Sequence, residues 1–217
     1  MTNDFEKSLY KDKNIKSDEV CGVDEAGRGP LAGRVYASAV ILPENACEIE
    51  ELKGLDDSKK LSEKKREKLV ESIKKYALSY CVAYAEKDEI EEINILNAAL
   101  LAMNRAISGL DKKARFAIID GNANKNIIIP SVTVVGGDAK CPSVAAASIL
   151  AKTERDRYCV EYLDKKYPEY NFAKHKGYGT KEHYAAVEKY GLCKEHRESF
   201  FKKYFESREK KENDSHR

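Results

Sequence analysis

The sequence predicts an α/β fold in which a mixed β-sheet carries helices on its faces. Its apolar segments follow the order β-β-α-β-α-β-β-α along the chain. The first two β-type runs are joined by a short Gly-rich turn, which suits antiparallel neighbours. Later runs are separated by helix-length segments, which suits crossover connections and parallel pairing.

The expected strands are short runs rich in β-branched and aromatic residues. They cover Val20–Asp24, Arg34–Leu42, Leu78–Ala85, Phe116–Ile119 and Val132–Val135. Pro43 ends the second run, and Ala26–Gly33 is the turn expected to close a hairpin between the first two.

Longer segments show the apolar spacing of amphipathic helices. They cover residues 69–77, Asp88–Ser108 and Ser143 to about Lys165. Pro142 suits the first turn of the last helix, and Pro168 ends it. The small residues of Ser143–Ala151 indicate close packing of this helix rather than chemistry.

These elements make up a domain that spans residues 18–164. Residues 1–17 form a polar leader ahead of it, residues 165–205 a helical extension, and residues 206–217 a charged tail. The total of 217 residues suits one substantial domain with a small appendage.

Composition and the chain start exclude several classes of protein. No apolar run approaches the roughly 20 residues that cross a bilayer, and the polar start lacks the apolar core of a secretory signal. We therefore expect a cytoplasmic monomer without membrane attachment. The six cysteines show no C-x-x-C pair, so reduced thiols, several of them buried, are expected rather than a zinc site or disulfides.

Positive charge is concentrated in one segment. Lys165–Lys203 holds ten Lys or Arg against five Asp or Glu, together with three of the four histidines and eight of the nineteen aromatic residues. Such a segment can bind phosphates and stack on sugars or bases, or it can be an ordinary solvated helical surface.

Three acidic sites share one feature, because each lies where an apolar strand gives way to glycine. They are Asp24-Glu25 in CGVDEAG, Asp120 in AIIDG and Asp138 in VVGGDAK. Ligands of helix-covered sheets collect outside such strand ends. Carboxylates gathered there repel one another, and divalent cations that take their oxygens as ligands relieve the repulsion.

Each acid also has a purely structural interpretation. An Asp after a strand is commonly a turn former or helix cap, and Asp138 stands where it could cap the following helix. Glu25 has Arg28 three residues further on, within reach of a local ion pair. Spacing alone leaves the metal site and the structural roles about equally supported.

The residues around these acids resemble ribonuclease HII, the type 2 ribonuclease H family. The resemblance spans roughly residues 20–200 and rests on GVDEAGRGPLAG (22–33), LDDSKKLS (55–62), IIDGN (118–122), GGDAKCPSVAAASILAKTERD (136–156) and HKGYGT (175–180). It implies an RNase H-like fold whose C-terminal helical extension helps to bind substrate.

For the acids, the resemblance implies that Asp24, Glu25, Asp120 and Asp138 are catalytic, metal-binding carboxylates. They would hold Mg²⁺ or Mn²⁺, with two ions during catalysis and Asp24 bridging them. The implied reaction is hydrolysis of RNA in RNA–DNA hybrids and cutting on the 5′ side of ribonucleotides embedded in duplex DNA. It leaves 5′-phosphate and 3′-hydroxyl ends.

For the substrate, the resemblance implies that Gly27, Arg28 and Gly29 form a ribose-sensing loop and that Tyr178 stacks on a sugar at an RNA–DNA junction. Glycines let a backbone approach nucleic acid closely, and the 2′-hydroxyl distinguishes RNA from DNA. The structural alternatives are a hairpin turn and a core-capping ring. Four lysines are expected to contact phosphates, unless they are merely solvated: Lys59, Lys60, Lys140 and Lys176.

Other functions share some of these features. The sister type ribonuclease HIII carries an additional N-terminal domain, whereas only 23 residues precede Asp24 here. Another RNase H-like nuclease would cut all-DNA branched substrates. A non-catalytic module would bind nucleic acid through its basic C-terminal part, and the presence of all four acids argues against it.

Overall fold

The computed structural model describes residues 3–55 and 61–215 and contains a five-stranded sheet. Its strands are β1 (Val20–Ala26), β2 (Val35–Ile41), β3 (Ser79–Ala85), β4 (Phe116–Asp120) and β5 (Ser131–Val134). Their order across the sheet is β3-β2-β1-β4-β5. β1 and β3 run antiparallel to β2, whereas β4 is parallel to both β1 and β5. The predicted mixed sheet is confirmed.

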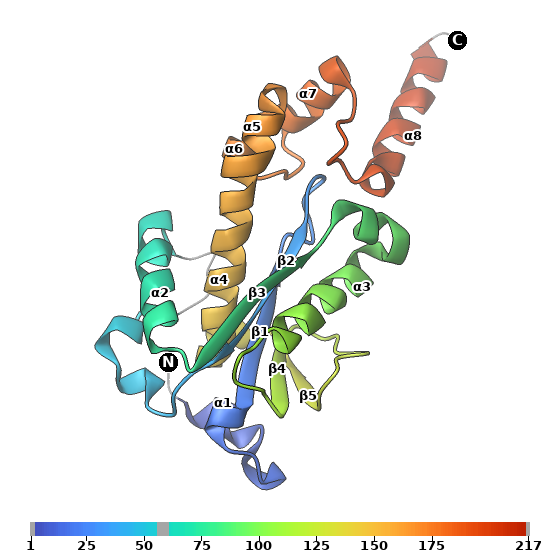
Figure 1. Cartoon of the computed structure of the whole chain (residues 1–217). Helices are drawn as coiled ribbons and strands as arrows, with labels where there is room; N and C mark the ends of the chain where they lie inside the picture. Colours follow the sequence, from blue (N-terminus) through green and yellow to red (C-terminus); the bar gives the residue numbers. More distant parts are fainter. Residues whose placement is uncertain (1–2, 56–60, 216–217) are drawn as a thin grey trace.

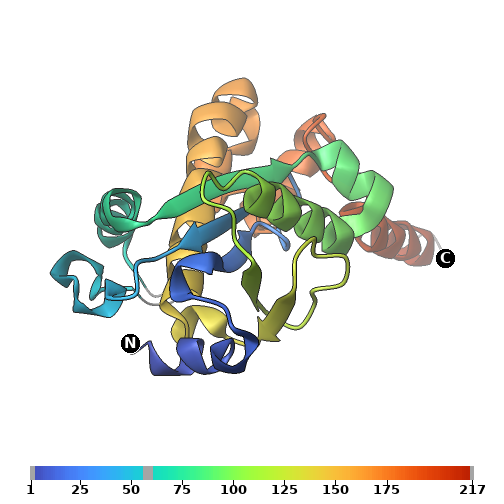
Figure 2. The same cartoon turned by 60° about the horizontal axis from the view of Figure 1, so that its bottom comes forward.

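Helices cover both faces of this sheet (Figures 1 and 2). α3 (Lys87–Ser108) packs on one face, and α2 (Glu63–Tyr76) and α4 (Pro142–Tyr158) lie on the other. The predicted order of strands and helices is confirmed. One detail differs: Asn94 interrupts α3 with φ 66°, and its side-chain oxygen accepts the N–H groups of Leu96 and Asn97.

α4 approaches β1 unusually closely. A Cβ atom on Gly22 would lie 2.2 Å from the main-chain carbonyl carbon of Ser143, so only glycine permits this contact. Most of the small side chains of Ser143–Ala151 are fully buried, as close packing requires. This contact brings α4 to the acidic end of β1.

Residues 3–17, which belong to the predicted polar leader, fold onto this body. They contain α1 (Asp4–Ser8), whose Glu6 is buried and accepts the N–H of Ser143 at 3.1 Å. Burial raises the pKa of Glu6. The N-terminal segment therefore satisfies one of the free N–H groups at the start of α4.

The C-terminal part forms a helical extension beyond α4, at the end of that helix opposite α1 (Figure 1). The chain continues through the π-helical turn Cys159–Leu163 into further helices. These are α5 (Asp164–Lys166), α6 (Phe172–His175), α7 (Lys181–Tyr190) and α8 (Glu198–Ser215). The charged tail was expected to follow the helices, but α8 runs through it to residue 215. No described helix is long and apolar enough to cross a membrane, and the six cysteines are free thiols.

Candidate active site

Two parallel strands, β1 and β4, bring acidic residues together. Val23 lies opposite Ile119 in their register, so the next residues along the two strands, Asp24 and Asp120, are also neighbours. Glu25 follows on β1. Burial of the apolar strand residues therefore places three carboxylates near the C-terminal ends of these two adjacent strands.

Asp24 is the most buried of these acids, with 6% of its surface exposed. It accepts the N–H of Glu25 at 2.7 Å and a hydrogen bond from the hydroxyl of Ser148 on α4. Burial, followed by the charges of Glu25 and Asp120, holds the pKa of Asp24 well above its usual range. A cation at this position would oppose each of these effects.

Glu25 lies 3.2 Å from the guanidinium of Arg28 across the turn that follows β1. The ion pair anticipated from their spacing is therefore present. Burial raises the pKa of Glu25, the charge of Arg28 opposes that rise, and the charge of Asp120 adds to it. Glu25 is thus coupled both to the neighbouring strand and to the Gly-rich turn.

Asp120 and Asp138 are linked through a single turn of chain. The N–H of Gly137 donates to Oδ1 of Asp120 at 2.7 Å, and Asp138 follows Gly137 in the 3-10 turn Gly137–Ala139. The N-cap position of α4 is Cys141 rather than Asp138, and the side chain of Glu6 accepts a free N–H at the start of that helix. The 3-10 turn therefore places the main chain at Asp138 next to Asp120.

Within residues 3–55 and 61–215, these acids do not yet form a closed metal cage. No group of three or more acidic, His or Cys side chains is arranged there to hold an ion as it stands. Glu25 is paired with Arg28, and Asp120 accepts the N–H of Gly137. The donor set itself suits a hard divalent cation, because it consists of carboxylate oxygens with raised pKa values at Asp24 and Glu25.

The Gly27–Gly29 turn and Tyr178 lie beside each other next to these acids. A Cβ atom on Gly29 would be 3.7 Å from Cε1 of Tyr178. Tyr178 is 43% exposed, which argues against the core-capping alternative. The guanidinium of buried Arg155 lies 5.7 Å from the centre of that ring.

The lysines predicted to contact phosphates are less informative. Lys140 Nζ donates to the carbonyl of Val135 at 2.6 Å, and Lys176 Nζ donates to that of Ala173. Both therefore have main-chain partners in this structure. Lys59 and Lys60 lie outside the described residues.

The interpretation of Lys165–Lys203 as a basic, aromatic surface is wrong for much of the segment. Its three histidines are buried, and several of its rings pack into a core under the extension. That core includes Tyr170, Phe172 and Phe201. The aromatic enrichment therefore mainly reflects a small hydrophobic core, while Tyr178 remains exposed.

Residues that sequence reasoning missed support the site from behind. Ser148 was treated only as a packing residue, yet its hydroxyl binds Asp24. The predicted basic surface includes Arg197, and no site prediction covers Arg155, yet 0% of Arg197 and 1% of Arg155 is exposed. No local pattern distinguishes these buried arginines from solvated ones, because their partners are distant main-chain carbonyls.

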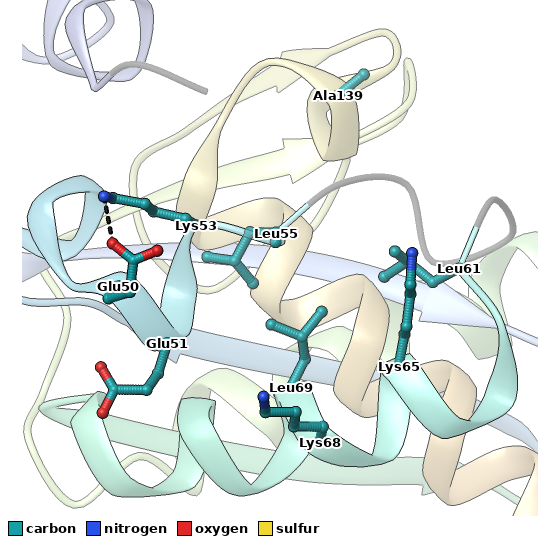
Figure 3. Close-up of a pocket in the computed structure, with 10 residues that line it drawn as sticks. Glu50, Glu51, Lys53, Leu55, Leu61, Lys65, Lys68, Leu69 and Ala139 are labelled. Atoms are coloured by element: carbon teal, nitrogen blue, oxygen red, sulfur yellow. Dashed lines mark hydrogen bonds and ion pairs between the residues drawn. The ribbon is translucent and has the colours of Figure 1, made fainter.

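A hollow of about 640 Å³ lies beside α2 (Figure 3). Its walls mix leucines with charged side chains, and Lys53 forms an ion pair there with Glu50. Ala139, the residue after Asp138, borders it. The hollow therefore adjoins the acidic site without containing any of its carboxylates.

A mixed sheet covered by helices, with carboxylates at the ends of adjacent strands, defines an RNase H-like, metal-dependent nuclease. The family model described as Ribonuclease HII matches residues 21–207. The chain belongs to the ribonuclease HII family. It is accordingly a metal-dependent endoribonuclease, and the family's reaction is endonucleolytic cleavage of RNA in RNA–DNA hybrids.

Individual relatives agree with this assignment. Ribonuclease HII from Burkholderia thailandensis is 52% identical over 189 residues, which cover 87% of this chain and 86% of the relative. That from Caldanaerobacter subterraneus subsp. tengcongensis is 50% identical over 199 residues, covering 92% and 79%. The solved ribonuclease H2 of Pyrococcus horikoshii OT3 has a TM-score of 0.68 at 28% identity, over 83% of this chain and 92% of that one. The non-catalytic alternative is thereby set aside.

Proposed function

We propose that this enzyme cuts the RNA strand of RNA–DNA hybrids and also cuts duplex DNA on the 5′ side of a single embedded ribonucleotide. The products carry 5′-phosphate and 3′-hydroxyl ends. The observation that carries the proposal is the continuity of the site. Asp24 and Glu25 lead through the Glu25–Arg28 ion pair into the Gly-rich turn, and Gly29 lies beside exposed Tyr178.

The catalytic, metal-holding residues in this proposal are the four carboxylates Asp24, Glu25, Asp120 and Asp138. Their oxygens are the ligand type that Mg²⁺ and Mn²⁺ prefer. Burial raises the pKa values of Asp24 and Glu25, and repulsion between carboxylates adds to that rise; the repulsion falls when positive charge is held between them. Two bound ions would supply an activated water and stabilise the departing oxygen.

The chain's own groups position the substrate. The backbone at Gly27 and Gly29 approaches the ribose closely enough to sense its 2′-hydroxyl. Arg28 exchanges Glu25 for a phosphate oxygen, which frees the carboxylate for its role in the site. The exposed ring of Tyr178 packs on the sugar at the RNA–DNA junction. Lys59, Lys60, Lys140 and Lys176 contribute phosphate contacts.

Incubation with a duplex that carries one ribonucleotide tests this proposal when the cut position is mapped. With Mg²⁺ or Mn²⁺, we expect a single cut on the 5′ side of that ribonucleotide. Asp120→Asn should abolish cutting while hybrid binding is largely kept, because the substituted carboxylate is not a phosphate contact. An intact duplex with the wild-type enzyme, or unchanged cutting by Asp120→Asn, contradicts the proposal. Cutting of hybrids alone would instead indicate the substrate preference expected of the HIII type.

A further inference from the structure

Arg197 is a fully buried cation that binds the Gly-rich turn from behind. Its exposed fraction is 0%. Within the described residues, every hydrogen bond that its guanidinium donates goes to a main-chain carbonyl and none to a carboxylate. The acceptors are Gly27 at 2.8 Å, Arg28 at 3.0 Å, Pro30 at 2.8 Å, Gly33 at 2.9 Å and Arg34 at 3.2 Å.

This arrangement fixes the shape of the turn. A guanidinium is a rigid planar fork, so acceptors that share it must hold fixed directions. Burying a cation without a carboxylate is costly, and burial lowers the pKa of Arg197 to about 9. Five carbonyl contacts compensate for that cost only while the turn keeps this conformation. The residue is therefore coupled to the turn rather than to overall packing.

Glu195 and His196, which precede Arg197, also hold the Gly-rich turn through their main chain. Gly33 N–H donates to the carbonyl of Glu195 at 2.8 Å, and Ala32 forms a β-bridge with His196. The loop that carries Tyr178 joins from the other side, since the N–H of Leu31 donates to the carbonyl of Gly177 at 2.8 Å.

His196, the residue before Arg197, is connected to the main chain of Tyr178 through hydrogen bonds of His183. His196 Nδ1 accepts the N–H of Cys193 at 2.8 Å, so its Nε2 carries the proton and donates to His183 Nε2 at 2.9 Å. His183 Nδ1 then carries a proton and donates to the carbonyl of Tyr178 at 3.0 Å. Both rings are neutral with every nitrogen paired, which agrees with their burial.

We propose that Arg197, with the His183–His196 pair, is a positioning element that holds the Gly27–Gly29 backbone and Tyr178 in a fixed mutual arrangement. By doing so it sets the enzyme's preference for a ribonucleotide at the cleavage position. None of these three residues touches the substrate. The inference rests on the proposed function, because it concerns how the two substrate-recognising parts of that site are aligned.

Arg197→Lys tests the inference, because it keeps the charge and removes the fork. Two readouts apply: hydrogen exchange of the 27–34 segment without substrate, and the ratio of kcat/KM on a single-ribonucleotide duplex to that on an all-RNA hybrid. We expect faster exchange confined to residues 27–34 and 175–180, and a ratio reduced about tenfold or more. The control is Ile73→Ala, in the buried core between α2 and α4. It should lower the Tm and leave the ratio unchanged.

The outcomes separate the two proposals. Equal losses on both substrates, with exchange raised throughout the protein as in Ile73→Ala, overturn the positioning role. If the wild-type enzyme cuts neither substrate, the proposed function fails, and localised exchange still decides whether Arg197 holds the turn. Should Arg197→Lys not fold, His183→Phe keeps the aromatic packing and removes both hydrogen bonds. In His183→Phe, faster hydrogen exchange at residues 175–180 together with a reduced kcat/KM ratio supports the positioning role. Exchange and a ratio equal to those of the wild type contradict it.

Discussion

The hydroxyl of Ser148 on α4 donates a hydrogen bond to the buried carboxylate of Asp24 on β1. This contact depends on the close approach of the two elements at Gly22. It lowers the pKa of Asp24 and so opposes the rise caused by burial. A residue in the packing layer of the fold therefore favours the ionised form of a carboxylate in the acidic site.

Ser148→Ala should shift the acidic limb of the pH–rate profile to higher pH. Without the hydroxyl, the pKa of Asp24 rises further, so the ionised carboxylate needed to bind a cation forms at higher pH. The measurement is kcat/KM on an RNA–DNA hybrid between pH 5 and pH 9. Ser72→Ala is the matched control, because the hydroxyl of that helical serine donates to the carbonyl of Lys68 within α2. A profile that coincides with wild type contradicts this role of Ser148.

Asp24→Asn should abolish cleavage and make the protein more stable. The ionised carboxylate is destabilised by burial and by Glu25 and Asp120, and an amide removes that charge while retaining an acceptor oxygen. A gain of about 1 kcal/mol, or roughly 2–4 °C in Tm, is the expected scale at pH 8 without metal. A lowered Tm would show that Asp24 stabilises the fold rather than straining it.

Gly27→Ala should lower the Tm and the rate of hybrid cleavage far more than Gly191→Ala, although both glycines have a positive φ. Gly27 has φ 101°, and a Cβ atom there would lie 2.1 Å from Nε of Arg155. Gly191 has φ 80° with nothing within 4 Å of a Cβ atom, so Gly191→Ala carries backbone strain alone, about 1–3 kcal/mol. Thermal melts and hybrid cleavage measure both. Equal losses in Gly27→Ala and Gly191→Ala would mean that the Arg155 side chain can shift to accommodate the added Cβ atom.

Acid should destabilise the C-terminal extension through its histidines. Burial lowers the pKa values of His183 and His196 from 6.5 to about 4. The unfolded chain therefore binds more protons than the folded one between these values. The corresponding stability is present above pH 6.5 and is lost as the pH falls toward 4. Urea unfolding of wild type and His183→Phe at several pH values checks this, because the difference between them should change over that interval. A constant difference would refute it.

Much of the fold follows from local patterns. The alternation of strand and helix segments predicted the mixed sheet, since apolar periodicity reports which face of each element is buried. The glycines after two predicted strands indicated that Asp24 and Asp120 would lie near strand ends; Asp120 is the last residue of β4, whereas β1 continues two residues beyond Asp24. The break in α3 at Asn94 did not follow from periodicity, because the apolar spacing continues across it.

The supporting residues of the site could not be predicted in the same way. Arg197 is separated by more than 160 positions from each carbonyl that it binds. Its burial depends on the tertiary meeting of two loops, which leaves no trace in local composition. The histidines were likewise counted as part of a basic surface, although they pack as neutral rings in a separate core.

Mn²⁺ binding followed by calorimetry tests the central claim, which is that distant carboxylates converge to hold divalent ions. Asp24→Asn and Asp120→Asn should each weaken binding by about tenfold or more, since losing even an outer partner of a metal site costs roughly 10- to 100-fold. Asp164→Asn is the control, because Asp164 accepts the N–H of Ala173 in the extension at 2.8 Å and should leave binding unchanged. Undiminished Mn²⁺ affinity in both Asp24→Asn and Asp120→Asn would contradict the claim.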